Sequence, residues 1–200
     1  MATAQDRLNQ ILPSWYDLLT QWSLDGSLVA AATYALMLES SNAMTGSREL
    51  LNNFASQWLQ SNFKSLPPIV LLSAQDISGA MGAYADSTET IYLNKEWLLT
   101  AGAADIQKVL THELGHYLDD QLNKGDTQGD EGFLFAEQLL GSAQSGGQPG
   151  IQLIINDSTV VHTEFQFISA EASSQADNLI NSDLAWSSTI STSNEERAKA

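Results

Sequence analysis

The chain of 200 residues contains no cysteine, few basic residues and no long apolar run. Without cysteine it forms no disulfide, offers no thiolate to a metal and has no thiol nucleophile. Its 8 Lys and Arg against 24 Asp and Glu give a formal net charge of −16, which repels phosphate groups. We therefore exclude nucleic acid as a partner. No segment approaches the roughly 18 apolar residues of a membrane span, so we expect no membrane insertion.

The remaining sequence predicts an α+β protein in three parts. In residues 1–64, apolar side chains recur every three or four positions, which predicts a helical N-terminal subdomain of three helices. Residues 65–168 combine β-rich runs at Ile69–Leu72 and Thr90–Asn94 with helical patterns, so we expect one mixed domain. Residues 169–200, rich in Ser, Asn and Ala, predict a low-complexity C-terminal segment.

Within the central part, residues 103–123 and 131–141 have helical periodicity. Gly79 and Gly82 indicate a turn between the two β-rich runs. A flexible connector is expected at residues 142–150. Two further β-rich runs within residues 151–167 predict a hairpin that turns at Asn-Asp-Ser.

The first of these two helices contains the segment HELGH, which holds two of the three histidines. Positions i and i+4 share one helix face, so His112 and His116 can meet one metal ion. Glu113 lies about 100° round the helix, within reach of a water but not as a ligand. Gly115 costs roughly 1 kcal/mol relative to alanine, which indicates that something packs against the backbone there. A chance match on a solvated helix is the alternative.

A catalytic zinc ion normally has three protein ligands and one position for a water molecule, whose pKa it lowers. The third ligand must therefore come from outside HELGH. From the run TIYLN through VLTHELGHYLD to DEGFLFAEQL, the chain resembles the zincin metallopeptidases, and specifically the gluzincins, over residues 67–141. This resemblance implies a zincin-like domain with a small mixed sheet and an active-site helix.

For function, the resemblance implies a zinc-dependent endopeptidase that acts on a protein or peptide substrate. His112, His116 and Glu131 would bind the zinc ion, and Glu113 would be the general base. Residues 90–94 would form an edge strand that pairs with the extended substrate. HELGHYLDD also resembles, more loosely, the metal helix of lethal-factor-type toxin proteases and zincin-like modules of large secreted bacterial repeat proteins. We therefore expect secretion or cell-surface display without an N-terminal signal, with a cytoplasmic location as the alternative.

Several site assignments have competitors. Glu131 follows His116 at a shorter spacing than is usual in gluzincins, and Glu137 is the alternative ligand. Glu131 is preferred because it opens its helix, where acidic residues are favoured. His162 is a candidate for stabilising the transition state or for a three-histidine site, and Tyr92 is a second candidate stabiliser.

Asp120 follows His116 by four residues, where its carboxylate can accept an imidazole N–H. It also belongs to a run of oxygen-bearing side chains that would suit calcium as a second cofactor. The members of that run are Asp119, Asp120, Asn123, Asp126 and Asp130. A solvated acidic loop is the simpler interpretation, because the spacing does not match an EF-hand loop.

Two other functions compete with a general endopeptidase. The chain can be a non-catalytic interaction or adhesion module that keeps the zincin fold, since fold does not dictate function. It can also be a self-processing part of a larger secreted protein, with a cleavage zone after Ser169. The presence of Glu113 favours activity, because a module that only binds metal has no need of it.

Overall fold

The computed structural model describes residues 2–38, 46–125, 127, 129–141, 158–162 and 167–173. The helices are α1 (Ala4–Asp25), α2 (Ser27–Ala35), α3 (Ser47–Leu59), α4 (Lys95–Leu98), α5 (Ala103–Leu122) and α6 (Glu131–Leu140), with a 3-10 turn at Asp86–Thr88. The strands are β1 (Ile69–Leu72), β2 (Gly82–Ala85), β3 (Thr90–Asn94), β4 (Ser158–His162) and β5 (Phe167–Ser173). These elements confirm the α+β class. None of the helices in the described residues has the length and apolarity needed to cross a membrane.

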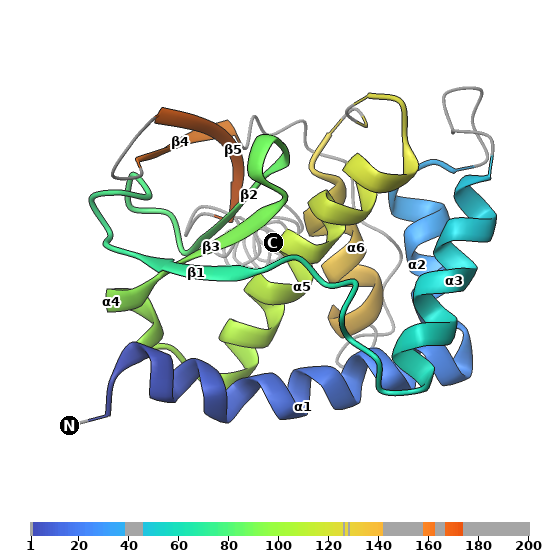
Figure 1. Ribbon diagram of the computed structural model, residues 1–200, viewed down its shortest axis with the longest axis horizontal. Coiled ribbons are helices and arrows are strands. Elements are labelled where there is room, and N and C mark those ends of the chain that lie inside the picture. Colours follow the sequence, from blue (N-terminus) through green and yellow to red (C-terminus); the bar gives the residue numbers. More distant parts are fainter. Residues whose placement is uncertain are drawn as a thin grey trace, which may run out of the picture.

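The three N-terminal helices are present, as predicted. A capping box between Thr3 and Asp6 starts α1, and Gly26, with φ 81°, ends it. In Figure 1, α1 runs along one side of the molecule beneath α5, while α2 and α3 stand at its far end beside α6. One apolar core joins α1, α2 and α3 to α5, α6 and one face of the sheet. The helical part therefore buries its apolar side chains against the domain that follows it.

The sheet has five strands in the order β1-β3-β2-β5-β4. β3 is the predicted TIYLN strand, but it pairs in parallel with β1 and antiparallel with β2. The expectation that residues 90–94 form an edge strand is therefore wrong, because both sides of β3 are occupied. The expected turn is present at Gly79, with φ 80°, whereas Gly82 begins β2, which pairs with β3 and β5.

The two faces of the sheet pack differently. Tyr84, Ile91 and Leu93 belong to the large core shared with α5. Tyr92 belongs to a smaller cluster with Val161 and Ile168. Because successive side chains of a strand point to opposite faces, Tyr92 lies on the sheet face away from α5.

The C-terminal strands form an antiparallel hairpin, β4–β5, in which His162 pairs with Phe167. This hairpin lies later in the chain than predicted, and the first predicted run, residues 151–155, lies outside the described residues, as does the connector at 142–150. β5 pairs with β2 and continues to Ser173, beyond the expected start of the C-terminal segment at residue 169. Residues 174–200 are also outside the described part.

Candidate metal centre

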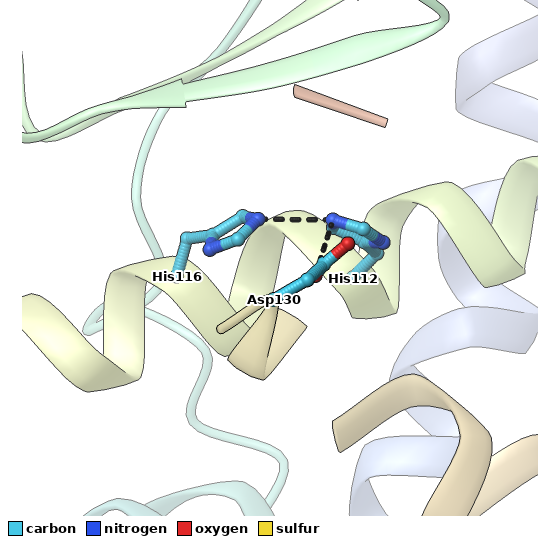
Figure 2. A group of neighbouring side chains, drawn as sticks. All are labelled: His112, His116 and Asp130. Atoms are coloured by element: carbon cyan, nitrogen blue, oxygen red, sulfur yellow. Dashed lines mark hydrogen bonds and ion pairs between the residues drawn. The ribbon is translucent and has the colours of Figure 1, made fainter. Parts of the chain in front are cut away.

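The histidine pair lies on α5, between the sheet and α6. The helix forms because its apolar side chains, among them Ile106, Leu110 and Leu114, are fully buried along one stripe. His112 and His116 are also buried, at 3% and 1% exposed. Their Nε2 atoms face each other at 2.9 Å (Figure 2). The predicted convergence of the two imidazoles is therefore present in the structure.

Two glycines allow α6 to approach this pair closely. A Cβ atom on Gly115 would lie 2.7 Å from the Cα of Gly132. A Cβ atom on Gly132 would lie 2.7 Å from the His112 carbonyl oxygen and 2.7 Å from His116 Nε2. All three distances are shorter than real Cβ contacts allow. The prediction that something packs against the backbone at Gly115 is confirmed, and the packing partner is the first turn of α6.

Asp130 is placed by the start of α6. It is the N-cap residue, and its Oδ1 accepts a hydrogen bond from the Phe133 N–H at 2.6 Å. The same Oδ1 lies 3.4 Å from His112 Nε2 (Figure 2). Asp130 is 5% exposed. His112, His116 and Asp130 thus form a buried group whose ligand atoms face one another and can hold a metal ion.

Two further carboxylates contact His116 on the other side of its ring. Glu131 Oε1 lies 2.6 Å from Nδ1, and Glu171 Oε2 from β5 also contacts Nδ1. His116, Glu131 and Glu171 form a second group that can hold a metal ion. The structure therefore brings Glu131 to the histidine pair, but at the ring nitrogen opposite the one that faces His112.

The two histidines have different electrostatic environments. Burial holds the pKa of His112 well below its usual value, and the nearby His116 and Lys108 lower it further. Burial also acts to lower the pKa of His116, but its hydrogen bonds to the Glu131 and Glu171 carboxylates outweigh this effect and raise that pKa well above the usual value. Burial raises the pKa of Glu131 to about 7. These shifts favour the uncharged form of His112 and the charged form of His116, whose Nδ1 faces the two carboxylates.

Glu113 is fully buried on the side of α5 that faces β2. A Cβ atom on Gly82 would lie 2.9 Å from Glu113 Oε1 and 2.6 Å from a methyl carbon of Val109. Gly82 thus leaves room for the Glu113 carboxylate beneath the sheet. The Glu113 carboxylate therefore lies on the sheet side of α5. Glu113 directly follows His112, the histidine that faces Asp130.

Other predicted residues lie elsewhere. The carboxylate of Asp120 accepts a hydrogen bond from the Tyr84 hydroxyl at 2.9 Å, and the structure shows no bond from it to a histidine ring among the described residues. Its expected place on an imidazole N–H is taken by Glu131 and Glu171. Glu137 of α6 pairs with Lys108 of α5 at 2.8 Å, and both side chains are about one-third exposed, at 36% and 32%.

Of the two candidate stabilisers, the structure places only Tyr92. Tyr92 is on the sheet face away from α5, because strand alternation sends it opposite to Ile91 and Leu93. Its hydroxyl lies 3.2 Å from Thr88 Oγ1. Tyr92 is therefore not a stabiliser at the histidine pair. The backbone of His162 ends β4, and its side chain lies outside the described part of the chain.

The proposed calcium run is dispersed. The carboxylate of Asp119 accepts hydrogen bonds from Asn123 Nδ2 and the Thr127 backbone N–H, at 2.6 and 2.9 Å. Asp120 bonds to Tyr84, while Asp130 faces His112. Asp126 lies outside the described residues. The described members of the run therefore point to three different places.

Two residues of the centre were not assigned to it from the sequence. Asp130 was considered only for calcium, although its position directly before the α6 pattern is that of an N-cap residue. Glu171 has no local signal, because it falls in a segment that was expected to be low-complexity.

A comparison of the chain with protein-family models, curated proteins and solved structures finds no match. The resemblance to zincins therefore stays a prediction, and the functional argument rests on the geometry of the centre.

Proposed function

We propose that the chain is a zinc-dependent endopeptidase whose metal ligands are His112, His116 and Asp130. The observation that carries this proposal is the spacing of three buried ligand atoms. His112 Nε2 lies 2.9 Å from His116 Nε2 and 3.4 Å from Asp130 Oδ1. Ligand atoms of a tetrahedral zinc ion, each at about 2.0–2.1 Å, are about 3.3 Å apart. Two imidazoles and one carboxylate are also a common donor set for catalytic zinc.

The chemistry of His116 favours Asp130 over Glu131 as the third ligand. A neutral imidazole has one N–H and one lone pair, on different nitrogens. When His116 loses one proton to bind a metal, the contacts of Nδ1 with the Glu131 and Glu171 carboxylates favour keeping the N–H on Nδ1, which leaves the lone pair on Nε2. His116 can therefore bind a metal ion through Nε2, together with His112 and Asp130. Glu131 remains the competing ligand, with a separate test in the Discussion.

Zinc bound there would supply a Lewis acid that polarises a peptide carbonyl and makes water more acidic. In the proposed reaction, Glu113 takes a proton from the attacking water and delivers it to the departing amine nitrogen. The peptide C–N bond breaks, and the water oxygen becomes part of the new carboxylate. The packing of Glu113 against Gly82 supports a fixed position for its carboxylate.

One observation favours a second function, a non-catalytic module stabilised by its metal. His112, His116, Glu113 and Asp130 are each 5% exposed or less, so the centre is closed in this conformation. A metal ion shielded from solvent can stabilise the fold, as structural zinc does, whereas a catalytic zinc ion needs a position that water and substrate can reach. An endopeptidase with this centre must open for its substrate or act on a segment of its own chain.

The first experiment measures the metal. We expect elemental analysis of the purified chain to find one zinc ion per molecule, and the His112→Ala variant to have lost it. Ser23→Ala, a change on α1 far along the chain from this centre, serves as the control and should retain the ion. Undiminished zinc in His112→Ala would overturn the proposed centre.

The second experiment separates the two functions. Glu113→Gln should keep the zinc ion and the fold while losing about 10²- to 10⁴-fold in hydrolysis rate, because it removes the proton acceptor. The assay should use unfolded protein substrates and, separately, mass analysis of the chain for self-cleavage. If the zinc-loaded wild type and Glu113→Gln are equally inert in both assays, the non-catalytic module is the correct function.

A further inference from the structure

The β4–β5 hairpin contributes one side chain to the metal centre. β5 pairs antiparallel with β2, and Glu171 lies opposite Tyr84 in this pairing. Ile168 and Ala170 of the same strand pack in the small cluster on the sheet face away from α5. By alternation, Glu171 is on the face toward α5, where its carboxylate meets His116 Nδ1. Figure 1 shows β5 beside β2, at the upper left of the molecule.

We infer that Glu171 is a positioning residue, and that the hairpin completes the metal centre by orienting His116. The inference rests on the proposed metal site. It adds a role for β5, which begins about 50 residues after the HELGH segment. Glu171 contacts Nδ1 of His116, whereas the Nε2 atom of that ring faces His112. Its carboxylate accepts a hydrogen bond from Nδ1–H, which sets the tautomer and the rotation of the ring and so directs the Nε2 lone pair toward His112 and Asp130.

The arrangement of the two carboxylates supports separate roles. Glu131 begins α6 and is 2% exposed, so its carboxylate comes from the same element as Asp130. The Glu171 side chain comes from the sheet and is 32% exposed. The carboxylate oxygens of Glu131 and Glu171 lie within 4.8 Å of each other. His116 is therefore held from two independent elements, and only one of them, α6, adjoins the HELGH helix in the chain.

This predicts that the HELGH helix and α6 bind metal at full affinity only when the hairpin is docked on β2. Outer carboxylates of this kind typically contribute about 10- to 100-fold to metal affinity. A glutamine at position 171 retains an oxygen that can accept the Nδ1 proton and an amide that can donate to Glu131. An alanine retains neither group.

The test compares zinc affinity in the full chain, measured by competition with a chromophoric chelator. We expect Glu171→Ala to bind zinc about 10- to 100-fold more weakly than wild type, with Glu171→Gln between the two. Asp17→Ala removes the same charge from the exposed surface of α1 and should bind like wild type. Substituted cobalt(II) gives a second readout, because its visible absorption reports ligand geometry, and we expect a changed spectrum in Glu171→Ala.

The outcomes separate this inference from the proposed function. If Glu171→Ala and Glu171→Gln retain wild-type affinity and cobalt spectrum while His112→Ala loses the metal, the centre stands and the role of Glu171 is refuted. If His112→Ala keeps its zinc, both fail. A lower unfolding temperature of metal-free Glu171→Ala without a change in affinity would mean that Glu171 only holds the hairpin, and would also refute the inference. Should the alanine variant not fold, the glutamine variant decides by the same affinity comparison.

Discussion

The first three helices and the segment from Thr111 to Glu131 bury different kinds of side chain. In the described part of α1, α2 and α3, the buried residues are apolar except for Ser47. In the second segment, many polar or charged residues are buried: Thr111, His112, Glu113, His116, Asp119, Asn123, Thr127, Asp130 and Glu131. Burying such groups costs free energy unless each finds a partner. The three helices therefore stabilise the fold mainly through apolar packing, whereas the second segment depends on specific polar contacts.

This contrast suggests that stability and metal binding can be changed separately. Apolar side chains in the helices contribute by area and fit, which any substitution of similar size largely preserves. Polar groups of the centre contribute through particular atoms, so an isosteric change suffices to remove a role. The following predictions test whether the two regions are separable, beginning with the largest effect.

Trp58→Ala should reduce the free energy of unfolding by about 3–5 kcal/mol, because it removes a large side chain from the apolar core. Trp58 is 0% exposed and stacks on Phe54 within α3. Denaturant unfolding measures the loss, and chelator competition on the folded fraction should give wild-type zinc affinity. A parallel loss of affinity would show that the helices and the centre are one energetic unit.

Asp130→Asn should weaken zinc binding more than Glu131→Gln does. Asparagine is as good an N-cap residue as aspartate, so the change removes the charged ligand while preserving the start of α6. Glu131→Gln alters a contact to Nδ1 and should cost no more than the roughly 10- to 100-fold typical of outer contacts. Titration of both variants with zinc checks the order. The opposite order would make Glu131 the ligand, as the resemblance to gluzincins implies.

Gly132→Ala should destabilise the fold by about 1–3 kcal/mol and weaken zinc binding, because the added methyl group overpacks the α5–α6 contact. Its Cβ would lie 2.7 Å from His116 Nε2, so α6 or the ring must move. Gly125→Ala is the matched control, since a Cβ there meets nothing within 4 Å. Thermal unfolding with and without zinc measures both effects. Equal behaviour of the two variants would contradict the close approach.

Glu137→Gln should have the smallest effect, at most about 1 kcal/mol in stability, with zinc affinity unchanged. Glu137 pairs with Lys108 at 2.8 Å, and both side chains are about one-third exposed, at 36% and 32%. Partly exposed ion pairs of this kind contribute little. Elemental analysis and unfolding of this variant provide the check. A loss of zinc would transfer the third ligand from the first turn of α6 to its middle.

Much of the secondary structure was predictable, because periodicity and turn residues are local signals. The expected helix at residues 103–123 corresponds to α5, and that at 131–141 to α6. The runs Ile69–Leu72 and Thr90–Asn94 form β1 and β3. The helical spacing of His112 and His116 also correctly placed their ring nitrogens together, because i and i+4 side chains share a face whatever surrounds the helix.

The neighbours of these elements were not predictable in the same way. Strand pairing depends on residues far apart in the chain, so the sequence of β3 does not reveal that β1 and β2 cover both its edges. The short run Gly82–Ala85 has little strand propensity of its own and is held as β2 by its two partners. The sheet face occupied by Tyr92 likewise follows from the register of β3 between them.

The division is clearest at His116. Its presence in a helical pattern, one turn after His112, follows from local backbone geometry and can be read from neighbouring residues. Its contacts with Glu131 and Glu171 depend on the close passage of α6 at Gly132 and on the pairing of β5 with β2. These are long-range contacts, formed only when distant segments pack together. The chain order therefore specifies which ring is available, and the packing of α6 and β5 specifies which of its nitrogens faces the metal site.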